Sequence, residues 1–246
     1  MSLTYYYFPD RKDGFGAQFQ TLLYSIIFCE QNKQNFLYKG ITNIEHNYDN
    51  DPNYINKIDE LMNIKNNYTT MTTVKNNDVI RELPFNKLIN IIDRKFDYYL
   101  STPAFQRYKN IFWQNKVKYN FNNNNKFNIA VHIRRYCMAV DNGCKRQTIP
   151  ILNFKSIMNM IRQKYSNAQF HIYSVGDVEY FNPLLNQDVE LHINENISTT
   201  FIQMVSADAI ITSRSSLSHV AGMLSDGEVY YIPFWHPPRK EWIIIQ

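Results

Sequence analysis

The segment Phe127–Cys137 reads FNIAVHIRRYC, and it decides which kind of fold we expect for the chain. Residues 127–133 are mostly apolar and branched, which predicts a buried strand. That strand ends in Arg134 and Arg135, although an unpaired guanidinium held out of water is disfavoured by roughly several kcal/mol. We therefore expect the two arginines either to meet acidic side chains or to bind an anion.

A regular alternation of helices and strands follows this segment. We expect helices over 153–165, 199–207 and 215–225, and strands over 169–175, 189–193, 207–213 and 228–234. Short strands that alternate with helices predict a doubly wound, mostly parallel sheet. The Asn-rich run at 120–126 precedes the first of these strands and is the expected linker.

The first half of the chain opens in the same way. Leu3–Phe8 predicts a strand, Asp13–Gln18 a two-glycine turn, and the residues after it a helix. Residues 40–80 are polar and predict irregular loops with short strands, whereas 83–118 predict helices interrupted near Pro103. The expected fold class is therefore α/β, with two Rossmann-like domains (1–120 and 121–246) facing across a cleft.

The composition narrows the classes of partner. Of 246 residues, 44% are hydrophobic, which is enough for a packed core. The net charge of +4 is too diffuse for a nucleic-acid binder but is compatible with an anionic ligand. No run approaches the roughly 20 apolar residues that span a bilayer. No signal peptide is visible either, so we expect a cytoplasmic protein without a transmembrane segment.

Three cysteines cannot all pair with one another, and their spacing fits no zinc motif. Cys137 and Cys144 are close enough in sequence to bridge a local loop. Free thiols in a reducing compartment are the favoured interpretation for all three, including Cys29.

The ends of the strands carry the polar residues that suggest chemistry. In an extended strand His132 and Arg134 lie on one face, and Arg135 lies on the other. Ligands of open parallel sheets bind outside the carboxyl ends of the strands. A guanidinium there offers two parallel donors that match a phosphate.

A second polar segment, Ser213–Ser218, lies where a strand ends and a helix begins. One serine at such a place is an ordinary helix cap. The four serines of this segment exceed what one cap needs, and hydroxyls with free N–H groups at a helix start form a good phosphate site. We therefore assign Ser213, Ser215 and Ser216 as candidate phosphate ligands.

Asp177, after the strand at 169–175, either binds a nucleoside or serves as a turn residue. The arginine pair, the serine-rich helix start and the glycine loop of the first half together suggest a diphosphate site in a cleft between the two domains. The sequence holds no GxxxxGK[ST] motif, which argues against a P-loop enzyme. No D-x-D pair ends a strand, so we expect no metal cofactor, with arginines taking its place.

These motifs resemble those of the GT-B fucosyltransferases that use GDP-fucose. The family motif H-x-R-R-G-D resembles the segment His132–Cys137, and the family's serine motif resembles Ala207–Ser218. YSVGD resembles its strand ending in F-S-D-D, and Gly14–Gln18 resembles its glycine loop. The chain differs where the family has Gly-Asp, because Tyr136 and Cys137 stand there. It also has Ala17 and Arg214 where the family has Asn.

The resemblance implies a role for each residue. Arg134 would bind the β-phosphate and support the departing GDP, which makes it the catalytic candidate. His132 would orient Arg134 or contact the nucleotide, and Arg135 would support that site or the guanine pocket. The loop residues implied to approach donor or acceptor are Gly14, Gly16 and Gln18.

The resulting hypothesis is a metal-independent, inverting transfer of fucose from GDP-fucose to a hydroxyl of a glycan or protein, as in glycan biosynthesis. The N-terminal domain would face the acceptor, and the C-terminal domain would bind the donor. Three alternatives stay open: another nucleotide sugar, an inactive nucleotide- or glycan-binding module, and a structural domain with arginines in ion pairs. No general base is identifiable, because Asp10, Asp13 and Glu30 are more typical of surface or turn carboxylates.

Overall fold

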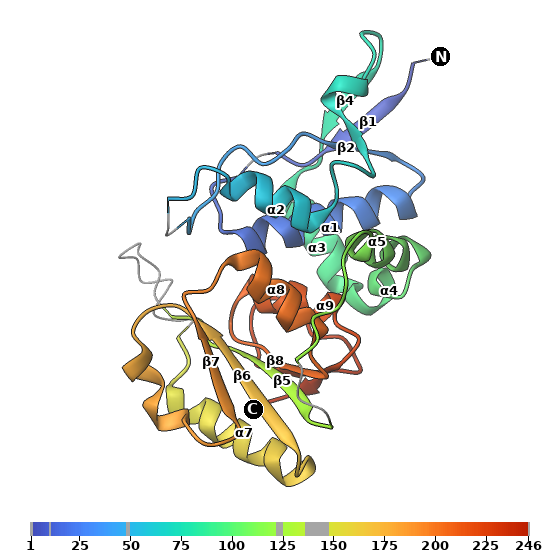
Figure 1. Cartoon of the computed structure of the whole chain (residues 1–246). Coiled ribbons are helices and arrows are strands. Elements are labelled where there is room, and N and C mark those ends of the chain that lie inside the picture. The colour runs from blue at the N-terminus through green and yellow to red at the C-terminus, as the bar shows by residue number, and fades with distance from the viewer. Residues whose placement is uncertain (1, 10, 48–49, 122–124, 136–147, 246) are drawn as a thin grey trace. The chain divides into compact units, whose positions relative to one another are not determined.

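The computed structural model describes residues 2–9, 11–47, 50–121, 125–135 and 148–245. The expectations for Tyr136, Cys137 and Cys144 therefore concern residues outside the described part. The chain divides into two compact units, Met1–Val117 and Lys118–Gln246. Each unit is an α/β unit built on a parallel sheet, so the predicted Rossmann-like fold class is confirmed for both (Figure 1).

The sheet of the second unit has six parallel strands in the order β10-β9-β8-β5-β6-β7. Their bounds are β5 (Phe127–His132), β6 (Ala168–Ser174), β7 (Val189–Ile193), β8 (Ala209–Ile211), β9 (Glu228–Tyr231) and β10 (Ile243–Ile244). In chain order this is the 3-2-1-4-5-6 arrangement of a dinucleotide-binding sheet, whose direction of winding reverses between β5 and β8. The carboxyl ends of these two strands are therefore the expected ligand-binding place.

Helices cover both faces of this sheet (Figure 1). The second unit contains α7 (Ile151–Lys164), the 3₁₀ segment η2 (Val178–Leu184), α8 (Ile197–Ser206) and α9 (Ser216–Leu224). Ile129, Val131 and Ile133 lie in one apolar cluster with residues of α7 and η2. Because side chains alternate along a strand, His132 and Arg134 belong to the opposite face, which α8 and α9 cover.

The first unit has a four-stranded parallel sheet in the order β3-β2-β1-β4. Its strands are β1 (Thr4–Tyr7), β2 (Asn35–Tyr38), β3 (Thr69–Thr70) and β4 (Val79–Glu82). Its helices are α1 (Phe15–Gln31), α2 (Tyr54–Met62), the 3₁₀ segment η1 (Met71–Thr73), α3 (Phe85–Arg94), α4 (Phe96–Leu100) and α5 (Pro103–Trp113). Buried α1 packs against α3 and α5 and forms the centre of this core.

The division after Val117 lies slightly before the expected boundary at 120, and two contacts explain it. The Lys118 ammonium pairs with Asp226 at 2.7 Å, and the Tyr119 N–H donates to Ser206 Oγ at 2.8 Å. Both contacts hold the start of the Asn-rich segment against the second unit. The expectation that the two units face each other across a cleft stays a prediction.

Two smaller observations complete the fold. Within the described residues, no helix is long and apolar enough to cross a bilayer. Cys29 is a free, buried thiol on α1, and burial raises its pKa to about 12, with a smaller contribution from Glu30. A thiol held so far from its thiolate form is a packing residue rather than a nucleophile.

Candidate functional site

The candidate site forms where β5 and β8 end side by side. His132, the last residue of β5, is buried, and its Nδ1 lies 2.7 Å from the Ser213 hydroxyl oxygen just after β8. Burial, with a smaller contribution from the Arg134 charge, lowers the pKa of His132 to about 3. The imidazole is therefore neutral at pH 7 and adds no charge to the site. It joins the ends of the two strands.

Arg134 continues along the same face as His132 and is half-buried. One of its guanidinium nitrogens, Nη1, donates to the Ser215 hydroxyl over a long 3.5 Å. Ser215 caps α9, because its hydroxyl oxygen accepts the Leu217 N–H at 3.3 Å. The arrangement places a permanent positive charge beside the N-terminus of α9, where the helix dipole also favours an anion.

The serines of this turn divide into two groups. Ser213, Ser215 and Ser218 are buried and bond to one another: the Ser213 N–H donates to Ser218 Oγ, and the Ser218 hydroxyl contacts the carbonyl oxygens of Ser213 and Ser215. They shape the turn. Ser216, at the first position of α9, is half-buried and is the serine best placed for a ligand.

Arg135 takes a different direction from Arg134. Its guanidinium carbon lies 3.8 Å from the centre of the Tyr180 ring, and Nη1 donates to the Asp177 carbonyl oxygen at 3.3 Å. These contacts fasten the end of β5 to the turn after β6. The Asp177 side chain is exposed, and only its backbone carbonyl takes part in this contact.

Asn194 completes that turn, and none of the motifs singled out in the sequence includes it. Gly176 has a φ of +103°, and its N–H donates to Asn194 Oδ1 at 2.8 Å. In return Asn194 Nδ2 donates to the Gly176 carbonyl oxygen at 3.1 Å. This reciprocal pair fixes the loop that carries Asp177, and an Asn just after a strand is the signal that could have identified it.

A pair of aromatic side chains, half-buried Phe234 and exposed Trp235, lies after β9. Phe234 and Trp235 have ring centroids 3.9 Å apart, and Trp235 is 63% exposed. Arg214 Nε donates to the Pro233 carbonyl oxygen at 3.2 Å, which connects this loop to the serine turn. Large exposed rings beside a polar site offer a stacking surface for a base or a sugar.

The glycine loop belongs to the first unit. Gly14 caps α1, and a Cβ at this position would come within 2.5 Å of the His46 ring. Gly16 is buried within the first turn of α1. Gln18 Nε2 donates to the carbonyl oxygens of Asp13 and Asn43 at 2.8 and 2.6 Å. Gln18 therefore holds two loop segments together.

Two of the carboxylates considered as candidate bases, Asp13 and Glu30, are paired, and Glu30 lies at the far end of α1 from the glycine loop rather than beside it. Asp13 lies 2.6 Å from Arg11 Nε. Glu30 accepts hydrogen bonds from Arg107 Nε and the Tyr68 hydroxyl, both at 3.1 Å. These contacts agree with the interpretation of Asp13 and Glu30 as structural carboxylates.

A cavity of about 390 Å³ lies at the other end of the second sheet, where β6 begins. Its lining residues are Lys126, Arg162, Tyr165, Ser166, Ala168, Gln187 and Asp188. Arg162 and Asp188 form a two-bond ion pair there, at 2.6 and 2.9 Å. Ligands of open parallel sheets bind at the carboxyl ends of the strands instead, so this cavity is not the expected ligand site.

No protein-family model matches the chain. No curated protein matches it at the sequence level. Solved structures do resemble it at low identity. One is the fucosyltransferase NodZ from Bradyrhizobium, with 10% identity, a TM-score of 0.42, and coverage of 89% of this chain and 93% of that one.

Two others are similar at the same level. The E. coli heptosyltransferase WaaC with ADP has 10% identity, a TM-score of 0.47, and coverage of 96% of this chain and 89% of that one. Arabidopsis thaliana FUT1 in complex with GDP has 10% identity, a TM-score of 0.44, and coverage of 98% and 72%.

Proposed function

We propose that this chain is a glycosyltransferase that takes its sugar from a nucleotide diphosphate donor. The main support for this proposal is that the Arg134 guanidinium lies beside Ser215, the cap of α9, at the point where the winding of the second sheet reverses. A diphosphate bound there would meet a fixed positive charge, a helix N-terminus and the Ser216 hydroxyl together. That combination suits a leaving group that gains negative charge as the sugar departs.

The reaction follows from this placement. As the bond from the anomeric carbon to the diphosphate breaks, the sugar acquires oxocarbenium character and the diphosphate gains charge. Arg134 stabilises that charge, while Ser215 holds the guanidinium in position. Neutral His132 keeps the ends of β5 and β8 joined without adding a competing cation. The acceptor hydroxyl attacks the anomeric carbon from the opposite side and releases its proton to water, so the anomeric centre is inverted.

GDP-fucose is the first donor to test, because the ordered motifs of the sequence resemble those of GDP-fucose enzymes. Phe234 and Trp235 provide a surface on which a base could stack, and such a surface accepts any base. ADP-heptose and UDP-glucose therefore belong in the same panel. The acceptor, a glycan or protein hydroxyl, is proposed to meet the first unit.

The test is turnover of each donor with a panel of glycan and peptide acceptors. We expect sugar transfer from one donor, at a rate that does not rise with added Mg²⁺ or Mn²⁺. Arg134→Ala should lower that rate by about 10²–10³-fold, as when one oxyanion-type donor is lost. Arg94→Ala is the matched control, since it removes an exposed arginine from α3 in the first unit.

Two results would overturn the proposal. An Arg134→Ala protein with the parental rate would remove the assigned role of that guanidinium. Donor binding without transfer or hydrolysis, across the whole panel, would instead favour a binding module.

A further inference from the structure

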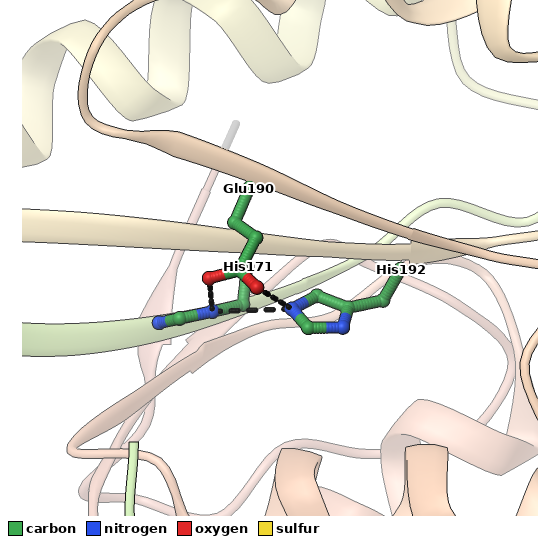
Figure 2. A group of neighbouring side chains, drawn as sticks. All are labelled: His171, Glu190 and His192. Atoms are coloured by element: carbon green, nitrogen blue, oxygen red, sulfur yellow. Dashed lines mark hydrogen bonds and ion pairs between the residues drawn. The ribbon is translucent and has the colours of Figure 1, made fainter. Parts of the chain in front are cut away.

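Three side chains on the sheet of the second unit converge outside the site described above. His171 on β6 and Glu190 and His192 on β7 lie on one face, because residues two apart on a strand share a face and His171 pairs in register with Glu190. Figure 2 shows the two rings and the carboxylate directed toward one another. No motif spacing in the sequence marks them, since they come from two strands.

The distances between the three groups are short. His171 Nδ1 lies 3.2 Å from His192 Nε2, and the Glu190 carboxylate lies 3.4 Å from the first nitrogen and 3.7 Å from the second. A tetrahedral zinc ion with ligands at 2.0–2.1 Å separates neighbouring ligand atoms by about 3.3 Å. The two ring nitrogens, and His171 Nδ1 with Glu190 Oε2, are close to this spacing, whereas the 3.7 Å distance runs to the other oxygen, Oε1. With one ligand atom from each residue, the three atoms lie within 4.8 Å of one another.

Outer hydrogen bonds fix which nitrogen of each ring is available. His171 Nε2 lies 3.1 Å from Asn128 Oδ1, an oxygen that can only accept, so this nitrogen carries the proton. The Asn128 amide is itself oriented, because its Nδ2 donates to the Lys126 carbonyl oxygen at 3.3 Å. The other ring nitrogen, Nδ1, is therefore the one that faces His192 and Glu190.

His192 is oriented in the same way. Its Nδ1 lies 2.8 Å from Glu195 Oε1, which leaves Nε2 directed at His171 Nδ1. Its ring also stacks on Tyr173, with centroids 4.8 Å apart and planes 19° from parallel. Two imidazole lone pairs and a carboxylate facing one another repel, unless a cation lies among them. A histidine ligand that donates its other N–H to a carboxylate or amide oxygen is the usual outer shell of a metal site.

We propose that His171, Glu190 and His192 bind one divalent transition-metal ion, with Zn²⁺ the best match. Two imidazoles and one carboxylate suit zinc, and nitrogen ligands disfavour Mg²⁺ and Ca²⁺. The histidines are buried, whereas the Glu190 side chain is 58% exposed, so the fourth position opens to solvent on the glutamate side. The ion would tie β6 to β7 and is separate from the proposed diphosphate site.

The test is zinc titration of the untagged chain by calorimetry, after any thiols that react in the native protein have been alkylated to remove thiolate sites. We expect one ion per chain and a rise in the unfolding temperature, because a ligand of the native state stabilises it. Co²⁺ should give the visible absorption of a four-coordinate ion. Mg²⁺ should give neither signal.

Variants of the chain distinguish zinc binding at His171, Glu190 and His192 from non-specific zinc binding elsewhere on the protein. Glu190→Gln changes an exposed side chain without altering its size, so the fold should persist, as checked by circular dichroism. It and His192→Gln should each weaken zinc binding at least about tenfold, and Glu195→Gln should weaken it by roughly 10–100-fold through the outer shell. His46→Gln, which removes an imidazole beside Glu45 in the first unit, should bind zinc normally.

One competing occupant is a proton shared between the two ring nitrogens. In that case zinc would bind no more tightly to the parental chain than to Glu190→Gln and His192→Gln, and the proposal would be wrong. Arg134→Ala keeps all three ligands and should bind zinc like the parental chain. Zinc binding and nucleotide binding can therefore fail independently.

Discussion

At the scale of single residues, the proposed site depends on groups whose charge is fixed by burial. His132 joins the ends of two strands only as a neutral ring, because its pKa is lowered to about 3. Arg134, two residues further along the chain on the same face, keeps its charge at any ordinary pH. Because His132 is neutral and Arg134 is charged, these two residues give the site one positive charge rather than two.

The buried histidines predict how stability depends on pH. Burial lowers the pKa of both His132 and His219 to about 3, against 6.5 in the unfolded chain. Between these values the unfolded state binds protons that the native state does not, so stability is full above pH 6.5 and falls as the pH decreases toward 3. Each histidine contributes up to about 1.4 kcal/mol per pH unit in this window.

Urea unfolding between pH 7 and pH 5 checks this expectation. The parental chain should lose free energy of unfolding steadily below pH 6.5, and His219→Gln should show a shallower loss. Equal stability at pH 7 and pH 5 would contradict the assignment of neutral buried rings.

At the scale of elements, most strands and helices between residues 127 and 231 were predictable because each carries a clear pattern, whereas η2 and β10 were not predicted. β5, β7 and α9 lie within about two residues of their expected bounds. In the first unit α2 was not predicted: its apolar residues Ile58, Leu61 and Met62 are correctly spaced, but the surrounding Asn and Lys dilute the pattern. β4 was not predicted for another reason: all four of its residues are exposed, so they show no alternation of apolar and polar side chains.

The sequence predicted that the polar residues at the ends of strands form a site, but it did not predict the contacts that each of them makes. A run of serines indicates a polar turn, yet hydrogen bonds across that turn decide that Ser213 and Ser218 face inward and Ser216 outward. Similarly, sequence could suggest that Gln18 contacts a ligand. The structure shows instead that the Gln18 side-chain amide donates to the backbone carbonyl oxygens of Asp13 and Asn43.

The loop before α1 makes a prediction of its own. Gly14→Ala would place a Cβ 2.5 Å from His46 Cδ2, which is closer than such atoms approach. We expect the variant to lose about 1–3 kcal/mol of stability through overpacking. The double variant Gly14→Ala/His46→Ala, in which the neighbouring ring is also removed, should recover part of that lost stability.

Denaturant unfolding of the single and double variants measures this coupling. If His46→Ala adds its own cost without any recovery, contact between the two positions is not what requires glycine at 14.

At the scale of the whole molecule, the chain consists of two α/β units, each with its own parallel sheet and core. The polar residues with a proposed donor role lie in the second unit, apart from the glycine loop. The division of labour between donor and acceptor stays a prediction, and amide hydrogen exchange can test it. GDP should protect amides at 129–135, 174–178 and 212–219 more strongly than amides of the first unit. Protection confined to residues before 118 would contradict that division.

The central claim is that Arg134 and the start of α9 form a diphosphate site, and calorimetric titration with GDP, ADP and UDP tests it most directly. We expect one nucleotide diphosphate per chain for the parental protein and for Arg94→Ala. Arg134→Ala should bind at least about tenfold more weakly, which is the loss of one charge-assisted contact of roughly 1.5–3 kcal/mol. Equal affinity of the parental chain and Arg134→Ala, or no binding of any nucleotide to the parental chain, would contradict the claim.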